Sequence, residues 1–491
     1  MPSVDRRTLL AGGLAGAAVA AFDPLSRGWV SVAEAREGGV PGSVAVPDLD
    51  GVLVTDPASL AGAADDFGHV VHRAPVAVLR PASVRDMVRM VGYANRHRIE
   101  VAMRGQGHAT FGQAQVRAGV VVDSRTLAAI DHIERHAAAV DAGVRWLDLA
   151  RATVAHGLTP PVFTDYVGLS VGGTLSGAGI GGTTQHYGFQ ADNVRELDVV
   201  TGDGRLRRCS PSHDPRLFNA VLGGLGQFAI ILRATIPLVP APEKARGYQL
   251  FYSELDTYLG DQRRLLAEGR FSSLQGQVAR TADDSGWELF IDAAAYYSSP
   301  HRPDDAALLA GLSFDPARTI ITEYGYLDWV NRLAPTVELL KQIGAWSLPH
   351  PWLDVFLPAS HTQRLVAGVL AELTPADVGH GPVLLYPFST RRLHRPFAEV
   401  PHEPVAFLFS LLRTAVPPTP DVIARMMAGN RLIYEQARDA GGKRYPIGSV
   451  RMSPEDWRDH YGPHWPAFAA AKARYDPRRI LTPGQGIFTT P

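Results

Sequence analysis

The stretch VAMRGQGHATFGQAQ, residues 101–115, joins an apolar run to a glycine-rich turn that carries a histidine. The run 101–104 is typical of a β-strand, and Gly105 ends it. Glycine has no side chain to hold a ligand away, so Gly105 and Gly107 allow backbone N–H groups to approach a phosphate closely. His108, at the tip of the turn, is then either a reactive group beside such a ligand or a turn histidine that bonds the backbone.

From about residue 50 to 240, short strands alternate with helices around this turn. Apolar residues recur at helical spacing in 83–98, with Ser83 as a candidate N-cap. The other predicted elements are strands at 76–80, 100–105 and 118–127, a hairpin at 196–210, and a helix, a glycine-rich turn and a strand within 214–242. Longer helices and aromatic strands follow a proline-containing boundary at 239–244. These patterns predict a mixed α and β protein.

A second glycine-rich run, GGTLSGAGIGG, covers residues 172–182, and a third, GGLGQF, covers residues 223–228. Gly177, Gly179 and Gly182 have the G-x-G-x-x-G spacing of dinucleotide-binding proteins. That fingerprint requires a strand before it and an amphipathic helix after it, and neither is evident here. A nicotinamide-type Rossmann fold is therefore not predicted, although tight turns alone account poorly for several such runs.

Length and composition exclude several classes of protein. A chain of 491 residues exceeds one ordinary core and predicts two domains. The net charge of -1, without long runs of like charge, gives no indication of a nucleic-acid partner and favours a small neutral substrate. The single cysteine, Cys209, cannot build a disulfide, a zinc site or an iron–sulfur cluster, and the histidines show no metal-binding spacing, so no metal site is predicted.

The N-terminus has the pattern of an export signal. Arg6 and Arg7 precede a run of Ala, Gly and Leu that is short for a membrane span, which needs about 20 residues. Paired arginines before a weakly apolar run resemble a twin-arginine signal, and VAEA at 32–35 offers a cleavage site. We expect residues 1–35 to be a signal region, the mature protein to be periplasmic or extracellular, and no membrane span; the alternative is a disordered or helical N-terminal tail.

Several motifs in order resemble one enzyme family. They are RGQGHAT with GQA, TDYVGLSVGGTLSGAG, NVRELDVVTGDG, VLGGLGQFAIILRA, YLDWVNRL, GAWSLPHPWLDVFLP and ILTPGQGIF. Together they resemble flavoenzymes of the vanillyl-alcohol-oxidase type, with a PCMH-type FAD-binding domain, and most closely cytokinin dehydrogenases. The resemblance implies an α+β fold: a discontinuous FAD-binding domain of two subdomains, and an inserted α+β substrate domain built on an antiparallel sheet. The expected ranges are 45–243 and 445–491 for the FAD-binding domain and 244–444 for the substrate domain.

By the same resemblance, the cofactor is FAD and His108 is joined covalently to the 8-methyl carbon of the flavin. Doubly attached relatives also use a cysteine, but Cys209 lies outside any matching motif, so a single attachment is expected. Ala109 stands where many relatives have serine, which removes one hydroxyl contact to phosphate. The other residues expected to contact the cofactor are Met103, Gly105, Gln106, Gly107, Gln113, Asp165, Ser170, Ser176, Ile180, Ile231, Tyr445, Thr482 and Gln485.

For catalysis, Asp165 matches the aspartate that acts as the general base in the family. The implied reaction takes hydride from the carbon next to a secondary amine, and the imine then hydrolyses to an amine and an aldehyde. Plant cytokinin dehydrogenases carry a glutamate that binds the purine where this chain has Gln275, whose amide still donates and accepts hydrogen bonds. Gln275 therefore either binds an adenine edge or marks a different donor.

Two other functions remain open from the sequence. An oxidase of alcohols or sugars could use the same scaffold, with Asp165 accepting a hydroxyl proton. A secreted protein that binds a flavin or another ligand without chemistry is the alternative of another class. The electron acceptor is expected to be oxygen or a quinone.

Overall fold

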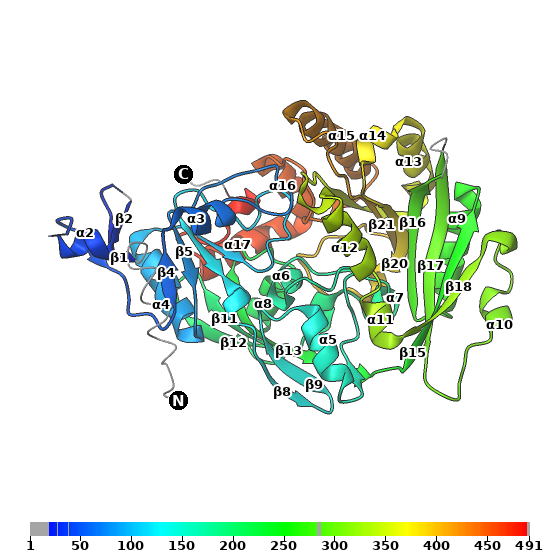
Figure 1. Cartoon of the computed structure of the whole chain (residues 1–491), viewed down its shortest axis with the longest axis horizontal. Helices are drawn as coiled ribbons and strands as arrows, with labels where there is room; N and C mark the ends of the chain where they lie inside the picture. Colours follow the sequence, from blue (N-terminus) through cyan, green and yellow to red (C-terminus); the bar gives the residue numbers. More distant parts are fainter. Residues whose placement is uncertain (1–18, 27, 38, 282–285, 489–491) are drawn as a thin grey trace.

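The computed structural model describes residues 19–26, 28–37, 39–281 and 286–488. It is elongated, with the glycine-rich loops, a four-stranded and a five-stranded sheet in one half and a large antiparallel sheet in the other (Figure 1). The predicted twin-arginine pair, Arg6 and Arg7, lies outside the described residues. Among the described residues, no helix has both the length and the apolarity to cross a bilayer.

A four-stranded sheet carries the opening motif. Three of its strands, β5 (Ala77–Arg80), β7 (Val120–Asp123) and β6 (Val101–Arg104), are parallel, and β4 (Val52–Val54) is antiparallel at one edge. Helix α4 (Val84–His97) connects β5 to β6, which are parallel and lie on either side of β7. It begins at the predicted N-cap, because Ser83 and Asp86 form a reciprocal capping box.

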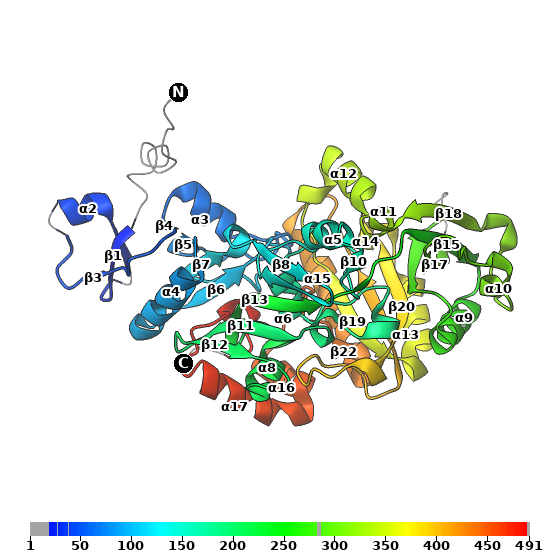
Figure 2. The ribbon, with the colours of Figure 1, turned by 90° about the horizontal axis from the view of Figure 1, so that it is seen from below.

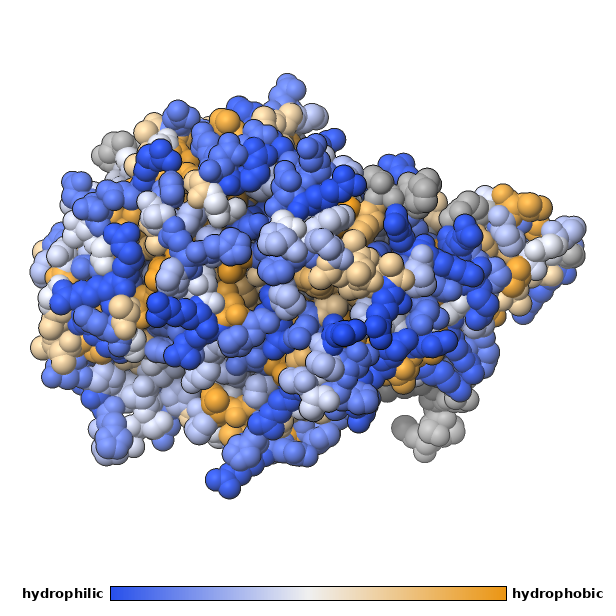
Figure 3. Space-filling view, turned by 180° about the vertical axis from the view of Figure 1, so that it is seen from behind, coloured by the Kyte–Doolittle hydropathy of each residue, from blue (hydrophilic) through white to orange (hydrophobic). Residues whose placement is uncertain are grey.

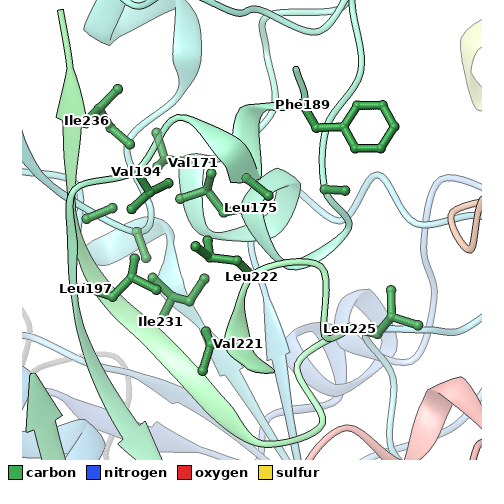
Figure 4. Close-up of a cluster of buried hydrophobic side chains, with 14 of the residues drawn as sticks. Val171, Leu175, Phe189, Val194, Leu197, Val221, Leu222, Leu225, Ile231 and Ile236 are labelled. Atoms are coloured by element: carbon green, nitrogen blue, oxygen red, sulfur yellow. The ribbon is translucent and has the colours of Figure 1, made fainter. Parts of the chain in front are cut away.

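A five-stranded antiparallel sheet lies beside the first. Its order is β12 (Leu206–Cys209), β11 (Glu196–Thr201), β13 (Ala229–Pro237), β9 (Ala137–Asp141) and β8 (Ile130–Glu134). The predicted hairpin of β11 and β12 is confirmed, and Gly204 in its turn has a φ of +79°. Helices α6 (Val171–Ser176) and α8 (Pro215–Val221) belong to the same core, where Leu175 lies near Leu222 (Figure 4).

The other half is built on an eight-stranded antiparallel sheet, so the predicted fold class is confirmed. The order of its strands is β18 (Ile320–Gly325), β15 (Lys244–Tyr252), β17 (Trp287–Tyr297), β16 (Ser273–Arg280), β20 (Val383–Ser389), β21 (Val405–Leu411), β19 (Leu353–Pro358) and β22 (Lys443–Arg444). Helices α9 (Leu255–Glu268), α13 (Ala359–Glu372) and α15 (Pro420–Asp439) pack on one face. The opposite face is turned toward the first half, since Phe388 and Leu408 on that face belong to the core that contains residues of α6 and α8.

The C-terminal segment returns to the first half. Helix α17 (Trp465–Tyr475) packs beside α8 (Figure 2). The backbone of Val101 in β6 then accepts a hydrogen bond from Thr482 N at 2.8 Å and donates one to Ile480 O at 2.7 Å. The segments before Lys244 and after Arg444 therefore pack together, and the eight-stranded sheet is formed by the chain between them. The domain boundaries themselves stay a prediction.

Part of the predicted signal region is folded in the structure. Strands β1 (Val19–Asp23), β2 (Gly28–Ser31) and β3 (Val44–Ala45) form a small sheet, and α2 (Val32–Arg36) covers the expected cleavage site. Phe22 packs in the core of the four-stranded sheet, and Trp29 stacks on Tyr93 of α4. The export signal stays a prediction.

Most large apolar side chains are buried in these cores. The face in Figure 3 is largely hydrophilic, and its apolar residues form small separate patches. The cavity described next has a largely apolar lining, as ligand-binding cavities usually do.

Candidate active site

A cavity of about 340 Å³ lies between the two halves. Every residue predicted to contact the cofactor lines it, from Met103 in β6 to Gln485 near the C-terminus. The wall across from the glycine-rich loops comes from the eight-stranded sheet, through Leu384 and Leu408. Gln275 lies outside this cavity and lines a small adjoining one, and the two cavities share Thr164 and Asp165.

The opening motif forms a tight turn at the end of β6. Gly107 has a φ of +70°, which favours glycine. A side chain at position 105 would collide with Ser170, so the first glycine turn packs directly on the start of the second glycine run. The buried carboxylate of Asp66 holds the turn from behind by accepting hydrogen bonds from Gly112 N at 2.7 Å and Gly68 N at 3.1 Å.

His108 lies among aromatic rings at the edge of the cavity. Its ring centroid is 4.0 Å from that of Phe67, 5.1 Å from that of Tyr166 and 5.4 Å from that of Trp352. Burial, together with the smaller effect of nearby His350, lowers the pKa of His108 to about 3. The imidazole is therefore neutral at physiological pH and has a free lone pair, as a nucleophile requires.

Asp165 lies in the loop that precedes α6, with its side chain 24% exposed to the cavity. One of its oxygens accepts a hydrogen bond from the amide nitrogen of Gln275. Arg332 donates in turn to the amide oxygen of Gln275, and its guanidinium is 3.8 Å from Asp165. Burial raises the pKa of Asp165 above the ordinary range, while Arg332 and Gln275 act in the opposite direction.

The sheet and the loop after it supply the groups that hold this carboxylate. Gln275 in β16 lies opposite Asp292 in β17, and it is 4% exposed. Arg332 follows α11 (Tyr326–Val330), lies over the ring of Trp329 at 4.5 Å and is 3.5 Å from Asp292. Asp165, Gln275, Asp292 and Arg332 therefore form one connected polar network behind the cavity, which we call the Asp165 network.

The comparisons with known proteins agree with this arrangement. A family model described as "Cytokinin dehydrogenase 1, FAD and cytokinin binding" matches residues 281–488, and one described as "FAD binding domain" matches residues 75–210. Cytokinin dehydrogenase 8 of Oryza sativa subsp. indica is 38% identical over 87% of this chain and 90% of its own length. Cytokinin dehydrogenase 2 of Arabidopsis thaliana is 34% identical over 90% of this chain and 94% of its own length. The chain belongs to the cytokinin dehydrogenase family.

A bacterial relative is also similar over nearly the whole chain. An uncharacterized oxidoreductase in the fasciation locus of Rhodococcoides fascians is 42% identical over 89% of this chain and 99% of its own length. Membership of the cytokinin dehydrogenase family confirms the predicted family, the predicted FAD cofactor and the prediction of an FAD-dependent oxidoreductase. The roles of individual residues stay predictions.

The cavity has the features that FAD requires. Gly173, Gly177 and Gly226 lie on its surface, and a Cβ at position 177 would meet no described atom closer than 3.5 Å. The backbone is therefore open to a ligand there. The amide oxygen of Gln485 is buried and has no hydrogen-bond partner among the described residues, so a bound group can supply one.

A buried lysine holds the C-terminal residues over the cavity. Lys472 donates to Leu481 O at 3.0 Å and to Gln227 O at 2.9 Å, and it forms an ion pair with Asp476 at 2.9 Å. The amide nitrogen of Gln227 donates to Thr482 O at 3.0 Å. These bonds fix the turn that places Thr482 on the cavity.

Sequence reasoning did not find Arg332, which lines the small adjoining cavity. Arg332 lies in the motif YLDWVNRL, which carried the resemblance, but no local pattern showed that it reaches Asp165. Of the aromatic residues in 345–358, Trp352 lines the cavity, whereas Phe356 packs on Tyr445 in the core. Cys209 is fully buried and burial raises its pKa to about 12, as expected of an unreactive thiol. Among the described residues, no cluster of potential metal ligands is found.

Proposed function

We propose that this protein is an exported cytokinin dehydrogenase that oxidises the side chain of N6-alkenyl adenines. The observation that carries the proposal is the position of Asp165. Its carboxyl group lies at the cavity wall, and Gln275 and Arg332, which contact it, favour its ionised form. Membership of the family and a largely apolar cavity support a flat, weakly polar substrate. Arg6 and Arg7 support export.

When bound, FAD supplies the acceptor for a hydride from the substrate carbon next to the amine nitrogen. In our proposal, Asp165 takes the proton from that nitrogen, so the C–H and N–H bonds break as the C=N bond forms. Water then adds to the imine carbon and the C–N bond breaks, which gives adenine and an unsaturated aldehyde. Asp165 must be ionised at the start of this sequence, and the positive charge of Arg332 favours that form.

Gln275 orients Asp165 and can also bond a ligand. Its amide oxygen accepts from Arg332 and one of its two amide N–H groups donates to Asp165, so the second N–H group can donate to a ligand. A ring nitrogen of adenine with a lone pair is a suitable acceptor, which supports the adenine edge as the group bound there.

We further propose that His108 carries the flavin covalently. Three features support this: its position at the cavity, its aromatic surroundings and a pKa low enough to keep the imidazole neutral. A bond from imidazole nitrogen to the 8-methyl carbon retains the cofactor after export. Reoxidation of the reduced cofactor is assigned to oxygen or a quinone.

Turnover on a substrate panel tests the proposed activity. Purified protein is mixed with isopentenyladenine, benzylic alcohols and sugars, and bleaching of the flavin is followed without oxygen. Bleaching by isopentenyladenine with release of adenine is expected. Bleaching by an alcohol or sugar alone would establish the alternative oxidase, and bleaching by none would favour a binding protein. Oxygen and a soluble quinone are then compared as acceptors.

A further inference from the structure

The cavity-facing side of the eight-stranded sheet carries one polar pair that the proposed reaction does not use. Along β19, Leu353, Val355 and Leu357 pack in the core beneath the helices, so Asp354 and Phe356 point to the opposite side. Asp354 and Ser410 line the cavity together with Leu384 and Leu408. A carboxyl group is thus placed on an otherwise apolar wall.

Asp354 is held by one hydrogen bond, yet one of its two carboxyl oxygens has no partner among the residues that the structure describes. Asp354 and Ser410 lie directly opposite each other in the β19–β21 register. The hydroxyl of Ser410 donates to Asp354 Oδ1 at 2.6 Å. The other oxygen, Oδ2, is buried and makes no hydrogen bond to the described residues, and the whole residue is 2% exposed. Buried polar atoms in proteins almost always have a partner, so this oxygen is a candidate for a contact with a bound ligand or water.

The neighbouring charged groups do not satisfy that oxygen. In β22, Arg444 donates to Gly448 O at 2.7 Å, and Lys443 donates to His460 O at 2.5 Å. Asn430 of α15 donates to backbone carbonyls. Tyr445, whose pKa burial raises, lines the cavity beside Asp354. Burial likewise raises the pKa of Asp354 to about 7, against the effects of Ser410 and Arg444.

We propose that Asp354 is a ligand-binding residue of the cavity, whose free oxygen accepts a hydrogen bond from a ring N–H of a planar nitrogen heterocycle, while Ser410 positions the carboxyl group. Two bound molecules have this chemistry: the flavin, through its imide N–H, and the purine of the substrate. That the flavin is the donor requires only that the protein binds the FAD of its family. That the purine is the donor also requires the proposed function.

The variant Asp354→Asn tests whether the flavin or the purine donates the hydrogen bond, because it keeps the shape of the side chain and removes its charge. Asp261→Asn is the matched control, because Asp261 is a buried carboxylate of the same half that does not line the cavity. The midpoint potential of the bound flavin and the affinity for adenine, read from the change that adenine causes in the flavin spectrum, are measured between pH 5 and 9.

If the flavin donates, Asp354→Asn should raise the potential at pH 8 by about 30 mV, which corresponds to a tenfold preference for the reduced form. The difference should shrink toward pH 5, where Asp354 is protonated in the wild type. If the purine donates, the potential should stay unchanged and adenine should bind about tenfold more weakly. A loaded, folded variant that matches the wild type and Asp261→Asn in both measurements would overturn the proposal.

If Asp354→Asn does not fold, Ser410→Ala provides a second test of whether Asp354 binds a ligand. It leaves the carboxyl group in place but removes the bond that positions it, so the same signature is expected at reduced size. A folded Ser410→Ala protein without either change would then overturn the proposal. Failure to oxidise N6-alkenyl adenines would refute the proposed function but would leave the potential measurement, and hence the flavin source, intact.

Discussion

Two surfaces of the cavity are built in opposite ways. The glycine-rich surface uses short continuous segments, residues 103–113 and 170–182, in which glycines and polar residues follow one another. The sheet surface gathers Asp354, Leu384 and Ser410 from three strands that are far apart in the chain. A continuous segment brings its own contacts with it, whereas the sheet surface exists only when distant strands pair in the correct register. Four variants test how differently the two surfaces contribute.

The largest effect is expected at Asp165, where the two surfaces meet. Asp165→Asn removes the proposed base but keeps a side chain that can bond Gln275. The turnover number kcat should fall about 10²–10⁴-fold with a small change in KM. Steady-state assays on isopentenyladenine measure it, and Asp148→Asn, a surface change, should retain full activity. A kcat near that of the wild type would remove Asp165 from the mechanism.

On the glycine-rich surface, His108→Ala should change how the flavin is held. In the wild type, the yellow colour should stay with the protein through acid precipitation, whereas the variant should release nearly all of its flavin. A peptide map with a flavin adduct at residue 108 is the direct check. Release of all flavin from the wild type would exclude the covalent bond but not the binding of FAD.

On the sheet side, Arg332→Met should show how much the positive charge of Arg332, as distinct from its packing, affects Asp165. The variant leaves Asp165 and Asp292 without their cation, so the pKa of Asp165 should rise further. Since the ionised base is the active form, the acid limb of the pH profile of kcat/KM should move to higher pH. Stability should fall by up to about 3 kcal/mol, the lower end for breaking a buried pair, because Arg332 is partly exposed. Arg332→Lys keeps the charge, so an equal shift in both variants would contradict an electrostatic role.

The smallest effect is expected at a helix cap remote from the cavity. Ser83→Ala removes the hydroxyl that accepts from Asp86 N at 3.2 Å at the start of α4. The free energy of unfolding should fall by about 1 kcal/mol in urea titrations, with kcat unchanged. Ser83→Thr retains the cap and serves as the control. A change in kcat would indicate that α4 couples to the cavity.

Sequence reasoning succeeded where the signal is local. The strand before His108, the helix that Ser83 caps and the hairpin at residues 196–209 all appear in the structure, because periodicity and turn residues determine them within a few positions. The residues of the glycine-rich motifs that were predicted to contact the cofactor likewise all line the cavity. Arg332 and Asp354 were not predicted, since neither has a distinctive local pattern.

By itself, the sequence determined the family, the cofactor class, the α+β organisation and the positions of the glycine turns, because each depends on short segments with few alternative conformations. Only the tertiary structure decided that Arg332 compensates Asp165, that Gln275 links the two, and that Asp354 lines the cavity with one oxygen unpaired among the described residues. Those properties depend on strand register and burial. A one-residue shift in β19 would turn Asp354 to the other face of the sheet, and no local sequence pattern specifies that register.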